Sequence, residues 1–216
     1  MIYKLVRVTL HSAAKAFFDF HCVGREKLVE EGGVLIASNH ESYFDPPLIS
    51  FIYRHPIHFL ARKTLFRGPA AWLYPRLNAH PVDQENPEMA SLKKIIRLLR
   101  GGERVLIFPE GARTEDGELQ SAEPGTGLIV SKAKVRVQPV RIFGARNCLP
   151  KGSGRVRRSP ITVVVGEVIE FSAEELDGKG KAAYQMISDR IMKEITALEL
   201  PPGRSDQAYC DRSQLH

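Results

Sequence analysis

The chain has 216 residues, of which 43% are hydrophobic and 26% charged, and it carries a formal net charge of +6. This length and composition suit one domain with a substantial core and exclude an intrinsically disordered chain. The positive charge favours an anionic partner, such as a phosphate-bearing substrate, an acidic lipid or nucleic acid, although solubility alone also explains it. Three widely spaced cysteines match no metal or redox motif, so we expect a reducing compartment.

The N-terminal 20 residues have a helical pattern. Lys4, Arg7, His11 and Lys15 form a narrow basic stripe beside a wide apolar face. A helix of this kind fits a membrane interface, and on its pattern alone it equally fits a terminal helix packed on the core. These charges argue against a signal peptide, and no uncharged apolar run reaches the ~18 residues of a membrane span.

Strand and helix patterns alternate along the remainder of the chain. Strands are expected at residues 34–38, 57–61, 79–83 (or an extended loop there), 104–108, 135–140 and 161–171, and helices at 46–52, 69–77, 87–100, 127–134 and 173–198. This alternation predicts a single α/β domain with a mostly parallel central sheet flanked by helices, plus the N-terminal amphipathic helix. We expect that helix at residues 1–22, the domain at 23–200 and a flexible tail at 201–216.

The turn after the strand at 34–38 holds His40, Asp45 and Pro46. Residues five apart do not share a helix face, so the two side chains meet only if the chain turns between them. Asp45 is a favoured helix N-cap and Pro46 a favoured first helical residue, which supplies such a turn. The Asp45 carboxylate then reaches one imidazole nitrogen and leaves the other to take a proton. The alternative is that Asp45 only caps the helix and His40 is an incidental loop residue.

A second polar loop, residues 108–114, follows the buried strand at 104–108. Loops at the carboxyl edge of a parallel sheet converge on ligand sites, and an arginine there, Arg113, suits a phosphate. Lys63 leaves the strand at 57–61 at the same predicted edge.

Residues 39–46 (NHESYFDP) resemble the NHxxxxD block of the glycerolipid acyltransferases, and residues 108–114 (FPEGART) resemble their FPEGxRS block. Residues 63–66 and 137–140 match two further blocks in the family order, so the resemblance covers roughly residues 30–170. The pattern is most similar to the bacterial 1-acylglycerol-3-phosphate acyltransferases of the PlsC type.

The resemblance implies that His40, oriented by Asp45, acts as general base on a glycerol hydroxyl of a lysophospholipid. That oxygen attacks the thioester of an acyl-CoA or acyl carrier protein, without an acyl-enzyme, a metal or a bound cofactor. The implied substrate-binding residues are Arg113, Lys63, Glu110, Gly111 and Thr114. Of these, Arg113 is the best candidate for the phosphate ligand, with Lys63 as a helper. Glu110 either binds the acceptor or orders the loop through hydrogen bonds, and we favour the ordering role.

The resemblance also favours membrane docking for the N-terminal helix, together with the basic loop at 151–158, on the cytoplasmic side of the cell membrane. One departure concerns Gln84, which stands where relatives often have arginine. The acceptor therefore stays open to another lysolipid or an amino-acid-based lipid.

A different class of function is a non-catalytic module that binds anionic lipid. Nucleic-acid binding is disfavoured because no aromatic residues are interleaved with the basic patches. A metal hydrolase is disfavoured because the sequence lacks a paired histidine motif such as HExxH.

Overall fold

The computed structural model describes residues 12, 17–82, 89–114, 116–149 and 155–204. Most of the predicted basic helix, Gln84, residues 151–154 and the tail from 205 onward lie outside the described residues.

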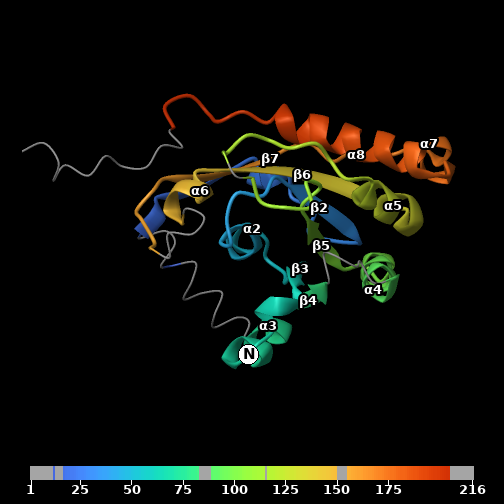
Figure 1. Cartoon of the computed structure of the whole chain (residues 1–216). Coiled ribbons are helices and arrows are strands. Elements are labelled where there is room, and N and C mark those ends of the chain that lie inside the picture. The colour runs from blue at the N-terminus through green and yellow to red at the C-terminus, as the bar shows by residue number, and fades with distance from the viewer. Residues whose placement is uncertain (1–11, 13–16, 83–88, 115, 150–154, 205–216) are drawn as a thin grey trace, which may run out of the picture.

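Within the described residues, seven strands form one sheet in the order β1-β7-β6-β2-β5-β3-β4 (Figure 1). The strands are β1 (Phe20–Val23), β2 (Val34–Ser38), β3 (His58–Arg62), β4 (Ala79–Val82), β5 (Arg104–Ile107), β6 (Arg136–Phe143) and β7 (Ile161–Val165). β6, β2, β5, β3 and β4 run parallel to one another, whereas β7 is antiparallel to β6 and carries β1 in parallel. The predicted mostly parallel α/β sheet is therefore confirmed.

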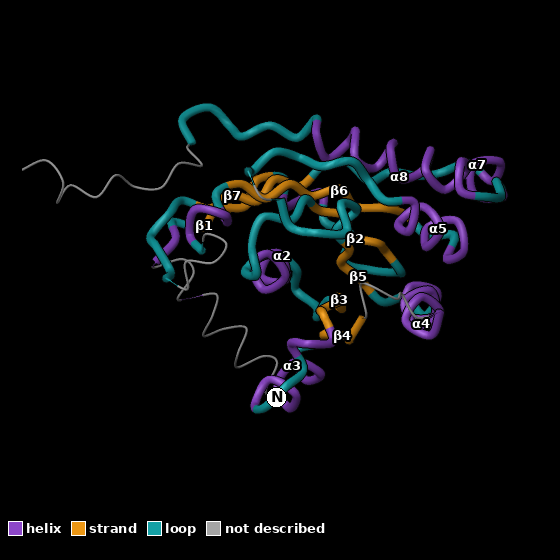
Figure 2. The backbone as a smooth tube through the Cα atoms, viewed as in Figure 1, coloured by secondary structure: helices purple, strands orange, loops and turns teal. Residues whose placement is uncertain are grey.

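The helices are α2 (Asp45–Ile52), α3 (Pro69–Arg76), α4 (Met89–Arg100), α5 (Pro124–Ala133), α6 (Ala145–Cys148), α7 (Ala173–Asp177) and α8 (Lys181–Thr196), with short 3-10 turns η1 (Arg25–Lys27) and η2 (Lys63–Leu65) (Figure 2). In the described part of the chain, none of these helices is long and apolar enough to cross a bilayer.

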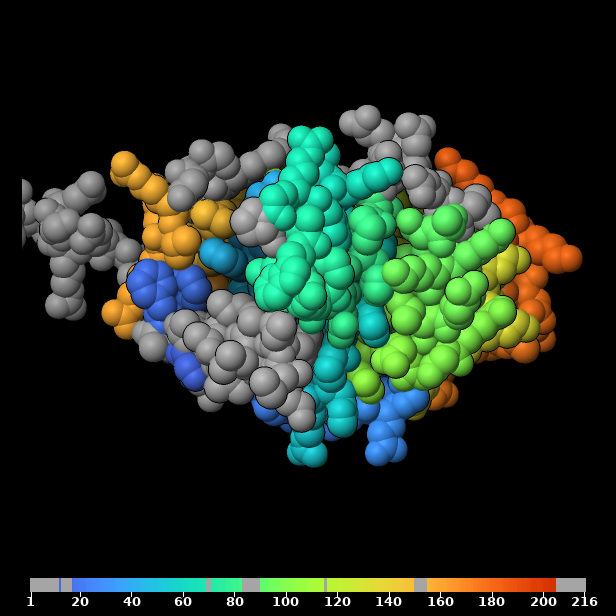
Figure 3. All heavy atoms as spheres, turned by 90° about the horizontal axis from the view of Figure 1, so that it is seen from below, coloured from blue at the N-terminus to red at the C-terminus, as the bar shows by residue number. Residues whose placement is uncertain are grey.

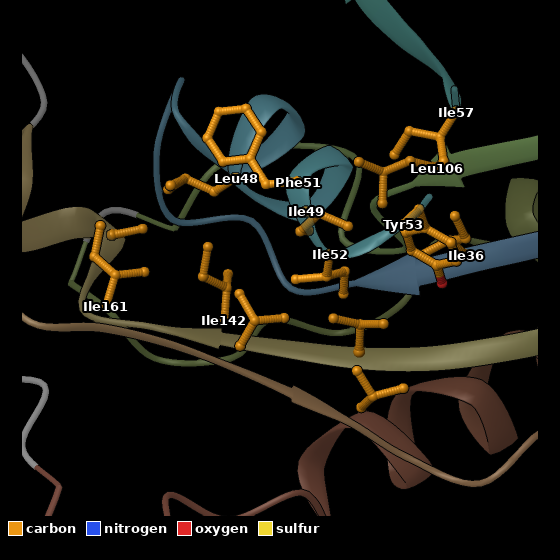
Figure 4. Close-up of a cluster of buried hydrophobic side chains, with 14 of the residues drawn as sticks. Ile36, Leu48, Ile49, Phe51, Ile52, Tyr53, Ile57, Leu106, Ile142 and Ile161 are labelled. Carbon is orange, nitrogen blue, oxygen red and sulfur yellow. The ribbon is translucent and has the colours of Figure 1, made fainter. Parts of the chain in front are cut away.

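The core consists of one apolar layer on each face of the sheet. α2 packs on one face, where Ile36, Ile49 and Leu106 belong to the same buried cluster (Figure 4). α4, α5 and α8 cover the other face, where Leu35 is buried. Neighbouring residues of a strand point to opposite faces, so a strand between two apolar layers is buried on both sides. All five residues of β2 are buried, and all but Ser38 are apolar. The central strand thus holds the turn that follows it between two rigid layers.

The prediction at the N-terminal boundary was wrong in part. Residues 20–22 do not end a helix but belong to β1, which pairs with β7 from Phe20 to Val23. Asp19, at φ 45°, breaks the helical path just before the strand. The predicted tail also begins in an ordered way, because Arg204 donates to the Asp19 carboxylate at 3.1 Å and to the Thr162 hydroxyl at 3.3 Å.

The C-terminal elements differ from the prediction as well. The β-rich run at 161–171 leaves the sheet after Val165 and makes only an isolated bridge from Ile169 to Val137. The long helix expected at 173–198 is divided into α7 and α8, because glycines at 178 and 180 interrupt it. α5 begins at Pro124, earlier than expected, since proline suits a first helical position.

Candidate active site

His40 and Asp45 meet in the turn between β2 and α2. The His40 Nδ1 and Asp45 Oδ2 atoms are 2.7 Å apart, and the Asp45 carboxylate is completely buried. The same Oδ2 accepts the backbone amides of Glu41 at 2.7 Å and Ser42 at 2.8 Å. Because the carboxylate is bonded to Nδ1, the Nε2 atom of His40 is the ring nitrogen left to exchange a proton with a substrate.

Asp45 is not the helix N-cap that its sequence suggested. Phe44 holds that position, and Asp45 is the first residue of α2, followed by Pro46. Its carboxylate points back to the amides of the preceding turn rather than forward to those of the helix. The turn therefore closes around the carboxylate, which fixes the side chain for its contact with His40.

The loop after β5 contacts both the ring and the backbone of His40. The Phe108 ring stacks on the imidazole with 3.8 Å between ring centroids and an interplanar angle of 12°. The His40 amide donates to Glu110 Oε1 at 2.8 Å, and the His40 carbonyl accepts from the Thr114 amide at 2.9 Å. The two sequence motifs, 70 residues apart, thus form one structural unit.

Glu110 is buried and accepts a second amide, that of Gln120, at 2.9 Å through Oε2. Burial raises the pKa of the Glu110 carboxyl, and the two amide donors partly oppose that shift. With both oxygens bonded to backbone amides, this geometry favours the loop-ordering interpretation of Glu110.

Asn39 has a positioning role that the sequence reasoning did not assign. Its side-chain amide donates to the Ile142 carbonyl at 2.9 Å, and its Oδ1 accepts the Ile142 amide at 2.8 Å. This pair ties the end of β2 to β6 one residue before His40. The available signal was an amide side chain directly after a buried strand, where a buried amide needs a backbone partner.

Arg113 packs against Tyr43, a second residue without a predicted role. The guanidinium carbon lies 3.7 Å from the centroid of the Tyr43 ring, which is 51% exposed. An aromatic face of this kind holds a guanidinium flat and leaves its N–H edge available for an anion. The signal was an aromatic residue inside the first motif, between His40 and Asp45.

A cavity of about 1230 Å³ opens beside these residues. Its polar end is formed by His40, Tyr43, Glu110, Gly111 and Arg113. Mainly apolar side chains from α2, β3, α3, α4, α5 and their flanks line the remainder, among them Phe51, Phe59, Leu77, Leu92 and Ile129. The volume and lining suit a long apolar chain whose polar end lies against His40.

Two predicted substrate-binding residues do not line this cavity. Thr114 is buried, and its hydroxyl donates to Asp116 Oδ1 at 3.0 Å and accepts the Gly117 amide at 3.0 Å, so it closes the loop. Lys63 is exposed on η2, and its neighbour Arg62 is the cation that reaches the cavity wall.

Gly111 does line the cavity. Its φ of +69° is one that residues with a side chain rarely adopt. Among the described residues, no group of three or more His, Cys, Asp and Glu side chains is arranged to hold a metal ion.

A histidine paired with a buried aspartate at the polar end of a largely apolar cavity, on the carboxyl edge of a parallel sheet, suits an enzyme that acts on a lipid-like substrate. Residues 19–143 match the family model described as Acyltransferase. The chain belongs to this family and is an acyltransferase.

Similar proteins of known name agree with this assignment. The chain is 32% identical over 180 residues to a Bacillus subtilis protein named 1-acyl-sn-glycerol-3-phosphate acyltransferase, covering 81% of this chain and 85% of that protein. A Streptococcus pneumoniae protein of the same name is 28% identical over 79% of this chain, which spans 61% of that protein. Among solved structures, the Thermotoga maritima 1-acyl-sn-glycerophosphate acyltransferase PlsC matches with a TM-score of 0.71 and 25% identity, over 93% of this chain and 82% of the other.

Proposed function

We propose that this enzyme transfers a fatty acyl group from a thioester donor to the free hydroxyl of 1-acylglycerol-3-phosphate, which gives phosphatidic acid. The observation that carries the proposal is the 2.7 Å contact between His40 and buried Asp45 at the polar end of the apolar cavity. The names of the similar proteins support the choice of acceptor.

In the proposed reaction, His40 Nε2 takes the proton of the acceptor hydroxyl as its oxygen attacks the thioester carbonyl. The tetrahedral intermediate then collapses, the carbon–sulfur bond breaks, and the leaving thiolate takes the proton from the imidazolium. The buried Asp45 carboxylate holds the reactive tautomer and stabilises the imidazolium between these steps. The acyl group passes directly to the acceptor, so the reaction needs no cofactor beyond an acyl-CoA or acyl carrier protein donor.

Arg113 is the proposed ligand of the acceptor phosphate. It lines the cavity on the same loop that grips His40, and Tyr43 holds its guanidinium flat. Lys63 adds positive charge beside Arg62 without lining the cavity, and Glu110, Gly111 and Thr114 shape the loop. A bidentate contact from Arg113 would fix the glycerol relative to the base.

The acyl chains of both substrates are supplied by, or returned to, a bilayer. We therefore place the enzyme peripherally on the cytoplasmic side of the membrane, with the N-terminal segment as one candidate contact.

The test is a thiol-release assay on the purified enzyme with an acyl-CoA donor and a panel of acceptors: lysophosphatidic acid, a zwitterionic lysophospholipid and an amino-acid-based lysolipid. We expect turnover with lysophosphatidic acid, loss of turnover in His40→Ala, and unchanged turnover in the matched control His55→Ala, which alters an exposed loop histidine. Full activity in His40→Ala would refute the mechanism.

The same assay also tests the identity of the acceptor. Arg113→Ala should raise the KM for lysophosphatidic acid with a smaller effect on kcat. A preference for another lysolipid would reassign the acceptor and leave the His40 mechanism standing.

A further inference from the structure

The chain between Pro46 and Val82 contains no aspartate or glutamate. Within it, the segment at residues 62–77, here called the α3 arm, consists of η2, α3 and their flanks. Arg62, Lys63, Arg67 and Arg76 are all exposed on this arm. Its local charge is therefore positive without any acidic residue of its own to offset it, which suits an anionic surface.

The α3 arm also carries an exposed aromatic side chain. Trp72 is 55% exposed, and the Arg76 guanidinium lies 4.2 Å from the centroid of its ring. Arg76 also donates to the Trp72 carbonyl at 2.7 Å. An indole held beside a cation at the surface is the combination that proteins place at the level of lipid headgroups.

The inner side of the arm belongs to the cavity wall, where Leu65, Tyr74 and Leu77 lie together with Arg62. One short segment thus presents Lys63, Arg67, Arg76 and Trp72 to the outside and mainly apolar side chains to the substrate space. The arm projects from the end of the molecule opposite α8 (Figure 1), and in Figure 3 it stands out in teal-green beside α4. The arm thus connects the outer surface with the cavity wall through the same short segment.

We propose that the α3 arm is a docking surface for an anionic lipid bilayer, with Trp72 at the headgroup level and the cavity opening at the interface. This proposal rests on the proposed function, because a lipid substrate is what gives membrane docking a purpose. The docking test below measures fluorescence and does not require the enzyme to turn over. An acidic carrier protein would also match the charges and the exposed indole. The inner side of the arm lines a largely apolar cavity that suits a lipid chain, so we favour the lipid surface.

Trp72 is the only tryptophan of the chain, so intrinsic fluorescence reports on this arm alone. We expect its emission to shift to the blue on addition of phosphatidylglycerol vesicles and to be quenched when the lipid chains are brominated. Phosphatidylcholine vesicles should give a much weaker response at the same lipid concentration.

Arg67→Gln tests the charge of the arm, with Lys193→Gln on α8 as the matched control, since both residues are exposed and neither lines the cavity. Loss of one interfacial cation should raise the lipid concentration for half-maximal shift roughly fivefold, and the control should leave it unchanged. Circular dichroism and thermal unfolding of each variant verify that it is folded.

Three outcomes would overturn the proposal. The first is unchanged Trp72 emission while the protein co-sediments with the vesicles, which means that another surface docks. The second is a response to an acidic acyl carrier protein and none to vesicles. The third is no vesicle binding at all. If the emission responds as expected but no lysolipid is acylated, the docking surface stands and the proposed function fails.

Discussion

Replacing Asp45 by Asn tests the central pair with a nearly isosteric change. In the native site, Asp45 Oδ2 accepts from His40 and from the amides of Glu41 and Ser42, all within 2.8 Å. Among the described residues, none hydrogen-bonds the buried Oδ1 atom. An asparagine can keep its oxygen at the three donors, but its NH2 group then occupies the position of Oδ1, where it finds no acceptor.

The magnitude follows from this geometry. An unsatisfied buried amide costs about 1–3 kcal/mol of stability. In the variant, the imidazolium that forms on His40 during the reaction no longer faces the negative charge of the Asp45 carboxylate. At a charge separation of about 4 Å and an effective dielectric constant of about 20, the lost attraction is ~4 kcal/mol. Each 1.36 kcal/mol is a factor of ten in rate, so we expect kcat to fall roughly 10³-fold with little change in the KM of either substrate.

The assay is thiol release at saturating donor and acceptor, with the free energy of unfolding measured in urea on the same preparations. His40→Ala gives the residual rate in the absence of the base, against which Asp45→Asn is compared. Activity of Asp45→Asn within tenfold of the wild type, while His40→Ala is inactive, would refute the idea that the carboxylate stabilises the imidazolium. If Asp45→Asn loses activity because it is unfolded, the urea data will show this, and its kcat is then left out of the comparison.

Three further changes address other parts of the molecule. Tyr43→Leu removes the ring under Arg113 and should raise the KM for the acceptor roughly two- to fivefold, whereas Tyr43→Phe should leave it unchanged, as steady-state kinetics would show. Gly127→Ala should cost about 1–3 kcal/mol or more in urea unfolding, because the added Cβ would meet a backbone carbonyl of α8. Burial and the nearby Lys94 lower the pKa of His80 to about 4, so the unfolded state binds this proton first as the pH falls. Stability should be complete above about pH 6.5 and fall towards pH 4, with a smaller fall in His80→Gln.

Each of these expectations has a contradicting result. An equal KM in the Leu and Phe variants at Tyr43 would show that the ring does not position Arg113. If Gly127→Ala has the same free energy of unfolding as the wild type, α5 and α8 can move apart to admit the added methyl group without loss of stability. An identical pH dependence of stability in the wild type and His80→Gln would show that His80 titrates normally.

The sheet was predictable because its central strands are buried on both faces. β2 and β5 are short, continuous apolar runs bounded by polar turns, and such runs have few alternatives. β1 was not predictable in the same way. Its pairing with β7 links residues about 140 positions apart, and nothing in the local pattern of residues 20–23 separates a short edge strand from the end of a helix.

The site was predictable to the extent that it follows motif spacing. The His40–Asp45 contact was inferred from a turn and a proline, although the capping role assigned to Asp45 was wrong. The orientation of Lys63 and Thr114 depends on where η2 and the loop after β5 direct their side chains. Motif spacing does not specify these orientations. It also did not predict the Tyr43–Arg113 contact, because an aromatic residue inside the first motif does not by itself identify its partner.

The bonds from the second loop to His40 have a consequence for how activity is acquired during folding. Glu110 accepts from the His40 amide and Thr114 donates to the His40 carbonyl, yet α2, β3, η2, α3, β4, α4 and β5 lie between the two loops in the chain. The bonds from Glu110 and Thr114 therefore form only when β5 has docked beside β2, and a nascent or partly unfolded chain that still contains the first motif lacks this part of the support of His40. Catalysis and global folding are in this sense a single cooperative event, so partly folded molecules should contribute no slow background acylation.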